Sequence, residues 1–336
     1  MQLHKKTADD KTECLLCPHY CRIDEGKTGI CGVRKNTGGI IELQTYGVIS
    51  SCSSDPVEKK PFYHYFPGHN ILSAGSYGCN MRCDFCQNFS ISQESFTENK
   101  NTIISPKNLV KMAIAAQRNI GVAFTYNEPV IWFEYMRDTS VEAKKHGMHT
   151  AMISNGYVNR EPLLEILKFI DAFNIDLKAF NDIFYRKLTG STLEPVKNTL
   201  RMIAEAGRHL EITTLVIPGQ NDNESEMKLE AEWIAHELGR DVPLHLSRYY
   251  PMYRRKEPAT SDDTLKRLSD IARENLDYVY IGNSRNDQGQ NTRCPVCGVN
   301  VTIRSGYNTS IINLDEKGRC TGCGKLIYLN YNTTFS

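Results

Sequence analysis

The grouping of the cysteines constrains this chain more than any other feature of its sequence. Eleven of the twelve cysteines fall into three groups, and only Cys52 stands apart. The three groups are, in chain order, Cys14, Cys17, Cys21 and Cys31; Cys79, Cys83 and Cys86; and Cys294, Cys297, Cys320 and Cys323. In a reducing compartment, such close spacing predicts metal ligands rather than disulfides.

The compartment and the classes of partner follow from the start of the chain and from its charge. The first residues, MQLHKKTADDKTE, lack the apolar stretch of a secretory signal. No apolar run approaches the roughly 20 residues that span a bilayer. Lys and Arg total 40 against 39 Asp and Glu, so the net charge of +1 gives no electrostatic case for nucleic acid or an anionic membrane. We therefore expect a cytoplasmic protein that binds neither of them.

The middle of the chain alternates short apolar segments with longer amphipathic ones. Strands are predicted over 71–74, 120–126, 150–154, 172–177, 210–217, 244–249 and 278–281. Helices are predicted from 106, from 129 to 147, over 160–169, over 195–206, from a capping box at 223–226 to 239, and after 261. Six or so strand–helix units predict an α/β fold with a parallel sheet closed into a complete or partial barrel, whose chemistry lies at the carboxyl ends of the strands.

The composition changes on both sides of this alternating region. We expect a cysteine-rich, irregular metal-binding segment over 1–69, a barrel over 70–289 and a zinc-ribbon-like tail over 290–336. The tail has two C-x2-C pairs separated by 22 residues, each followed by a glycine, Gly298 or Gly324. This pattern predicts a zinc site. Its role is expected to be structural, because so short a tail cannot build a hydrophobic core that stabilises it without a metal.

The N-terminal group has the spacing C-x2-C-x3-C-x9-C, with His19 inside it. It fits either structural zinc or an auxiliary [4Fe–4S] cluster that relays electrons, and the spacing leaves the choice open. Cys52 is predicted to be a plain small hydrophobic residue.

The central group has the spacing C-x3-C-x2-C, directly after the first predicted strand, in the sequence GCNMRCDFCQN. Three thiolates on one loop hold three irons of a cubane and leave the fourth iron open for a substrate. The alternative is a zinc site completed by Cys52 or a histidine. An odd set of three cysteines fits zinc poorly, since zinc sites usually pair their cysteines two and two.

With Phe85 at the aromatic position, this loop matches C-x3-C-x-aromatic-C and resembles the signature of radical S-adenosylmethionine (radical SAM) enzymes. The resemblance implies a partial barrel of six βα units, a [4Fe–4S] cluster on Cys79, Cys83 and Cys86, and S-adenosylmethionine bound to the open iron through its amino and carboxylate groups. It also implies one-electron cleavage to methionine and a 5′-deoxyadenosyl radical that takes hydrogen from a substrate. An electron donor of the flavodoxin or ferredoxin type is implied as a partner.

The same resemblance assigns cofactor-binding residues beyond the cysteines. FTYNEP places Asn127 and Glu128 where the family has a GGEP-like segment, although Glu-Pro before a helix is also a helix-start signal. Asp176-Leu177-Lys178 is similar to the DLK of glycyl-radical activating enzymes such as the pyruvate formate-lyase activator. It implies that Lys178 holds the cofactor carboxylate and that Asp176 binds a cation or polar group near the adenosyl part; the alternative is a surface charge pair.

Four further residues complete the predicted cofactor site, and two are candidate pocket residues. His245 corresponds to a histidine near the adenosyl group in the activators, against the alternative of a satisfied core histidine. The other predicted cofactor-binding residues are Phe85, Gln87 and Asn155. Glu211 and Thr213 share a face of one strand at period two and are candidates for the pocket.

The segments CLLCPHYC, GICGVR, DPVEKKPFYHYFPG, CQNFSISQ and YVYIGN resemble one subgroup, the radical SAM enzyme of the AmmeMemoRadiSam system. This resemblance implies Memo-like and AMMECR-like partner proteins. The substrate is then either a glycine backbone on a protein, as for the activators, or a small molecule. The rival hypothesis from a different class is a multi-zinc scaffold protein without enzymatic activity.

Overall fold

A mostly parallel eight-stranded sheet forms the centre of the computed structural model, which describes residues 3–7, 11–94, 102–284 and 289–331. Its parallel strands are β8 (Asn70–Gly75), β10 (Asn119–Phe124), β11 (His149–Ser154), β12 (Ala172–Asp176), β13 (His209–Val216), β14 (Leu244–Arg248) and β15 (Val279–Gly282). They are adjacent in chain order, and β7 (Ser51–Pro56) pairs antiparallel with β8 at one edge. Among the described residues the edge strands β7 and β15 do not pair with each other, so the barrel is open.

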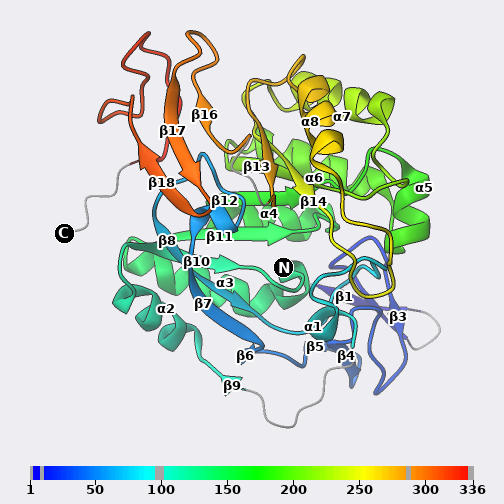
Figure 1. The fold of residues 1–336 in the computed structure, drawn as a ribbon. Coiled ribbons are helices and arrows are strands. Elements are labelled where there is room, and N and C mark those ends of the chain that lie inside the picture. Colours follow the sequence, from blue (N-terminus) through cyan, green and yellow to red (C-terminus); the bar gives the residue numbers. More distant parts are fainter. Residues whose placement is uncertain (1–2, 8–10, 95–101, 285–288, 332–336) are drawn as a thin grey trace.

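Helices connect the strands and lie outside the curved sheet (Figure 1). They are α1 (Phe89–Ser92), α2 (Pro106–Ala115), η2 (Pro129–Trp132), α3 (Phe133–Lys145), α4 (Arg160–Phe169), α5 (Asp182–Phe184), η3 (Tyr185–Thr189), α6 (Leu193–Glu205), α7 (Glu224–Glu237) and α8 (Asp262–Ala272). The predicted α/β fold with a parallel sheet is confirmed. None of the helices within the described ranges has the length and apolar character to cross a membrane.

The predicted helix starts agree with the structure, with one correction. The side chains of Ser105, Asn223 and Ser261 each accept a hydrogen bond from a backbone amide of the first turn, as N-cap residues do. The capping box at Asn223 is only half formed. The Glu226 carboxylate accepts hydrogen bonds from the Phe180 amide and the Asn181 side chain instead, and it therefore ties α7 to the loop after β12.

The N-terminal segment is more regular than its composition predicts. It contains β1 (His4–Lys6), β2 (Thr12–Cys14), β3 (Arg22–Ile23), β4 (Arg34–Thr37), β5 (Ile40–Leu43), β6 (Val48–Ile49), β7 and η1 (Val57–Lys59), and β6 pairs with β9 (Thr102–Ile103). The prediction of an irregular segment is wrong above all for β7, which extends the central sheet. Its sequence, SCSSDP, has no apolar run that would indicate a strand. The strand forms because its backbone pairs with the backbone of β8.

Residues 61–66 fill the interior of the barrel at the amino ends of the strands. The fully buried Glu211 carboxylate on β13 accepts hydrogen bonds from the amides of Tyr63 and His64, at 3.0 and 2.8 Å. His209 and His245 also donate to it, at 2.9 and 2.7 Å. Burial alone raises the pKa of a carboxyl group, but the two histidines hold the pKa of Glu211 well below its usual value.

The tail forms a three-stranded antiparallel sheet, β16 (Thr292–Arg293), β17 (Asn300–Ser305) and β18 (Asn308–Ile311). It is orange to red in Figure 1 and lies on the opposite side of the view from the blue strand β3. The buried Arg304 fastens it to the barrel by donating to the backbone oxygen of Tyr63 at 2.9 Å, and its guanidinium lies 4.1 Å from the centre of the Tyr63 ring. Arg304 also donates to the backbone oxygen of Gln290.

We expect Glu230→Gln to increase stability more at pH 8 than at pH 5.5. Glu230 is buried on α7 and accepts a hydrogen bond from Thr214, and burial raises its pKa to about 8. A carboxyl group whose pKa rises on folding stabilises the folded state below its unfolded pKa, and this contribution is lost as the pH rises toward 8. Glutamine does not titrate, so the variant escapes a loss of up to about 3 kcal/mol. The midpoint of thermal unfolding at the two pH values measures this difference.

The matched control is Glu232→Gln, an exposed glutamate on the same helix. It should leave the pH dependence of the wild type unchanged. An equal shift of the midpoint at both pH values for Glu230→Gln would contradict the prediction.

Candidate active site

A cavity of about 270 Å³ lies at the carboxyl ends of the parallel strands, where the barrel fold predicts the chemistry. The three central cysteines and seven of the eight predicted cofactor-binding residues border it. These residues are Cys79, Cys83, Cys86, Phe85, Gln87, Asn127, Glu128, Asn155, Asp176 and Lys178. The structure therefore brings these residues together from four separate parts of the sequence.

The loop that carries the central cysteines is fixed along its length by backbone hydrogen bonds. The amides of Arg82 and Asp84 donate to the backbone oxygens of Thr189 and Leu188 in η3, at 2.7 and 3.1 Å. The Cys79 sulfur accepts a hydrogen bond from the Met81 amide at 3.3 Å. The loop is thus held in place by the protein itself, with its thiols facing the cavity.

The spacing of the three thiols distinguishes between the metals that they can hold. A tetrahedral zinc site with Zn–S bonds of about 2.3 Å brings its sulfurs to within about 4 Å of one another. Within the described part of the chain, the central sulfurs are not among the groups whose ligand atoms all lie within 4.8 Å. At least one pair of these sulfurs therefore lies more than 4.8 Å apart, which a cubane allows because each thiolate binds a different iron. Cys52 pairs with Ala74 in the sheet and does not border the cavity, so it is not placed to complete a zinc site.

Two of the central thiols, those of Cys79 and Cys83, require a positive metal centre to be ionised near neutral pH. Burial raises the pKa of Cys83 to about 12 and that of Cys79 well above its usual value. A coordinating metal reverses this effect, because it deprotonates a bound thiol outright. The donor set of the loop therefore fits a thiolate-bound cluster.

Asn127 joins the end of β10 to the start of the cysteine loop. Its side-chain oxygen accepts a hydrogen bond from the Ser76 amide at 2.9 Å, and its side-chain nitrogen donates to the backbone oxygens of Tyr77 and Gly78 at 3.1 and 3.2 Å. Both of its N–H groups are used within the protein. Asn127 thus positions the cysteine loop and leaves no donor for a ligand.

Glu128 connects the carboxyl ends of two neighbouring strands. One of its oxygens accepts hydrogen bonds from the Val130 amide at 2.9 Å and the Ser154 hydroxyl at 2.7 Å, and the other accepts one from the Asn155 amide at 2.9 Å. Burial raises the pKa of Glu128 to about 7, although these hydrogen bonds act in the opposite direction. The oxygen with a single donor keeps a lone pair for a cationic ligand group.

Lys178 and Asp176 form an ion pair on the cavity wall after β12, with 2.9 Å between the amine and a carboxylate oxygen. Burial lowers the pKa of an amine, but the neighbouring Asp176 and Cys83 raise the pKa of Lys178 above its usual value. Its amine lies 5.9 Å from the centre of the Phe85 ring. The pair therefore supplies one positive and one negative group within a short distance of the cysteine loop.

His245 does not reach the cavity, although the resemblance places it there. It lies two residues before Ser247 on β14, and Ser247 borders the cavity while His245 binds Glu211 deeper in the barrel. On β13, Glu211 likewise lies two residues before Thr213. Of these two residues, only Thr213 borders the cavity. Of the two candidate pocket residues, Thr213 therefore lies at the cavity and Glu211 does not.

Ten further residues border the cavity and are not among the predicted site residues. They are Met81, Asn88, Ser92, Gln93, Thr125, Tyr126, Ile153, Ser154, Leu215 and Ser247. Period two along the strands would have found Leu215, two residues after Thr213. Tyr126 has φ of 71°, a conformation that favours glycine, and it occupies a glycine position of the GGEP-like segment.

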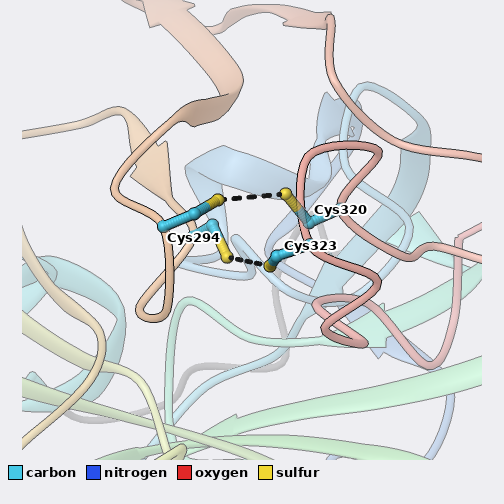
Figure 2. Close-up of side chains that lie close together, drawn as sticks. Cys294, Cys320 and Cys323 are labelled. Atoms are coloured by element: carbon cyan, nitrogen blue, oxygen red, sulfur yellow. Dashed lines mark hydrogen bonds between the residues drawn. The ribbon is translucent and has the colours of Figure 1, made fainter.

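The four tail cysteines lie close enough to bind one metal ion. The sulfur of Cys294 lies 3.4 Å from that of Cys323, and the sulfur of Cys297 lies 3.6 Å from that of Cys320. Figure 2 shows Cys294 and Cys323 turned toward each other from two separate turns of the chain. Gly298 and Gly324 both have positive φ, as the predicted turns after each pair require.

The comparisons with known proteins agree with this geometry. The Radical SAM superfamily model matches residues 74–230. An uncharacterized protein of Methanocaldococcus jannaschii is 41% identical over 327 residues, which cover 96% of this chain and 97% of that protein. The pyruvate formate-lyase 1-activating enzyme of Escherichia coli is 24% identical over 193 residues, which cover 55% of this chain and 76% of the enzyme.

Among solved structures, a radical SAM methyltransferase from Sphaerobacter thermophilus has a TM-score of 0.52 at 16% identity, covering 66% of this chain and 68% of that one. This likeness concerns the fold alone. The matched residues 74–230 include the central cysteine loop and the ends of β10, β11 and β12, which form most of the cavity. Residues 74–230 therefore form a radical SAM domain, of a superfamily that uses a [4Fe–4S] cluster and S-adenosylmethionine, and the chain is homologous to the glycyl-radical enzyme activases.

Proposed function

We propose that this protein cleaves S-adenosylmethionine reductively and abstracts hydrogen from a substrate at the cavity. The observation that supports this proposal is the meeting of three cysteine thiols with Glu128, Asp176 and Lys178 around one cavity. A [4Fe–4S] cluster, when bound, supplies the electron that converts S-adenosylmethionine to methionine and a 5′-deoxyadenosyl radical. The protein supplies the ligands, the orientation of the cofactor and the enclosing walls.

The charged residues of the cavity suit the two ends of the amino-acid part of the cofactor. The Lys178 ammonium binds the cofactor carboxylate, and the free lone pair on Glu128 accepts from its amino group. Asp176 holds Lys178 in position and faces the cavity, where it can accept from a polar group of the adenosyl part. Asn155 supports the cysteine loop, since its side chain donates to Asn80, next to Cys79.

The direct test is an anaerobic assay of the purified protein with dithionite and S-adenosylmethionine. A brown protein whose colour bleaches on reduction, together with formation of 5′-deoxyadenosine, supports the proposal. A colourless protein that contains zinc and no iron would overturn it in favour of the multi-zinc scaffold.

Lys178→Ala should weaken the binding of S-adenosylmethionine by about 10- to 100-fold, the loss expected for one charge-assisted hydrogen bond. Equilibrium dialysis of the cluster-loaded variant with labelled S-adenosylmethionine measures the dissociation constant. The control is Lys168→Ala on the outer face of α4, whose amine pairs with Glu165 at the surface. Equal affinity in the Lys178 variant and the wild type would remove Lys178 from the proposed site.

We propose the same three divisions as the sequence analysis, 1–69, 70–289 and 290–336, except that β7 and residues 61–66 of the first belong with the barrel, and we propose zinc as the metal of the tail. The tail sulfurs lie within 4.8 Å of one another, a separation that fits a single tetrahedral ion. Cys320→Ala should lose about one zinc ion per chain while the iron content stays unchanged. Metal analysis by mass spectrometry checks both numbers. Loss of iron with retention of zinc would show that the tail holds iron instead.

We further propose a protein substrate and a flavodoxin- or ferredoxin-type electron donor, on the homology to the activases. The second candidate is a small-molecule substrate with Memo-like and AMMECR-like partners, which the subgroup segments of the sequence favour. Incubation with labelled S-adenosylmethionine and each purified candidate partner separates them. Label or a glycyl radical on a protein supports the first, and a modified small molecule supports the second.

A further inference from the structure

The N-terminal cysteine group (Cys14, Cys17, Cys21 and Cys31) encloses a second, smaller cavity. All four cysteines border it, and Cys14, Cys17 and Cys31 are buried. The chain brings them together through short elements: the Cys14 amide at the end of β2 donates to the backbone oxygen of Cys21 at 2.9 Å, and Cys17 lies on the turn between them. Four thiols that converge on one enclosed space form a metal site in the absence of disulfides.

The spacing of these sulfurs argues against zinc. Among the described residues, the tail is the only set of three or more His, Cys, Asp or Glu whose ligand atoms all lie within 4.8 Å of one another. No three sulfurs of the N-terminal cysteine group therefore meet this limit, although all four border the same cavity. A zinc ion needs sulfurs about 4 Å apart. A cubane separates its thiolates further, because it stands between them.

His19 does not compete with the thiols as a ligand through its Nε2 atom. This nitrogen lies 2.7 Å from the backbone oxygen of Asn80 and donates its proton there. The cavity wall also includes the guanidinium of Arg34, which is almost fully buried and pairs with Glu134 through two hydrogen bonds. The Glu134 carboxylate balances the charge of this guanidinium, so Arg34 closes the cavity wall without adding a net charge.

We propose that the N-terminal cysteine group binds a second [4Fe–4S] cluster. Four protein thiolates leave this cluster without an open iron, so it does not bind S-adenosylmethionine. Its chemistry is reversible one-electron transfer, with electrons supplied by the same class of one-electron donor that serves the central site. The metal assignment stands on the N-terminal geometry alone, whereas a role in supplying the central site rests on the proposed function.

The two cysteine groups lie against each other. A Cβ atom on Gly78, directly before Cys79, would lie 2.5 Å from the backbone oxygen of Cys31. Arg82, from the central loop, donates both to the backbone oxygen of Ile30 and to that of Cys79. The two centres are therefore joined by direct backbone contact, which suits electron transfer between them.

The test uses the full chain, reconstituted anaerobically, and a variant that removes only the central ligands. With Cys79, Cys83 and Cys86 changed to alanine, we expect about four irons and four sulfides per chain, against about eight of each in the wild type. Dithionite titration should take up one electron per chain in the variant and two in the wild type. The electron paramagnetic resonance signal of the reduced variant should not change when S-adenosylmethionine is added.

A second variant, Cys17→Ala with Cys21→Ala, should retain about four irons and a signal that does respond to S-adenosylmethionine. The first variant keeps the N-terminal cysteine group intact, so its iron content decides the question even if the second variant misfolds. A first variant with no iron and about two zinc ions per chain would overturn the proposal. If that variant keeps its four irons while the wild type forms no 5′-deoxyadenosine, the proposed function fails and the second cluster stands.

Discussion

Cys83→Ala abolishes the formation of 5′-deoxyadenosine from S-adenosylmethionine under reducing conditions. Cys83 is one of three thiols around the cavity, and removing it leaves two protein ligands for a cluster that already has one open iron. The variant should lose the iron of the central site and, with it, all product above the background without protein. Chromatography of the products after anaerobic incubation with dithionite measures this effect.

The control for this prediction is Cys52→Ala. Cys52 lies in β7, opposite Ala74, and does not border the cavity. This variant should keep its iron and its product formation. Loss of product in both variants would mean that the cysteines are assigned to the wrong sites.

Glu211→Ala destabilises the folded protein by about 3–5 kcal/mol, the range for removing one partner of a buried ionic pair. The carboxylate is fully buried and accepts from two backbone amides and two histidines. Without it, these four donors lose their acceptor in an interior from which water is excluded. The denaturant midpoint at pH 7 should fall accordingly.

Glu232→Ala on the exposed face of α7 is the control, since an exposed glutamate of this kind contributes little to stability. The stabilising effect of Glu211 requires its ionised form, because its pKa is lowered on folding. It is present above the unfolded pKa and is lost as the pH falls toward the folded pKa. A Glu211 variant as stable as the control would show that the segment 61–66 does not depend on this carboxylate.

The sequence predicted the sheet well because its strands are buried on both faces. All six residues of β10, for example, are buried, so the strand appears as a continuous apolar run. The sequence also indicated which side chains border the cavity near the strand ends, since Asp176 is the last residue of β12 and Lys178 follows two residues later. Parallel strands place their carboxyl ends together, so position in the chain was enough to place these side chains.

The sequence did not predict how deep in the barrel a side chain lies, or which groups a polar side chain binds by hydrogen bonds. His245 and Ser247 share a face of β14, and only tertiary packing decides which of them reaches the cavity. Asn127 was predicted to contact the cofactor, yet its hydrogen bonds go to the cysteine loop. Spacing alone also left the N-terminal metal open, because the distances between its sulfurs depend on contacts with residues far along the chain.

The docking of Arg304 has a practical consequence for work with shortened forms of the chain. The segment that matches the superfamily ends at residue 230, before β14 and β15, and the tail begins later still. Arg304 caps a backbone oxygen of Tyr63, whose amide in turn binds Glu211 inside the barrel. A fragment trimmed to the matched segment would lack Tyr63 and Arg304 altogether, and a longer fragment that ended before the tail would leave the Tyr63 oxygen without its Arg304 donor and uncover Tyr278 and Tyr280. We therefore expect a stable shortened form of this protein to need the tail.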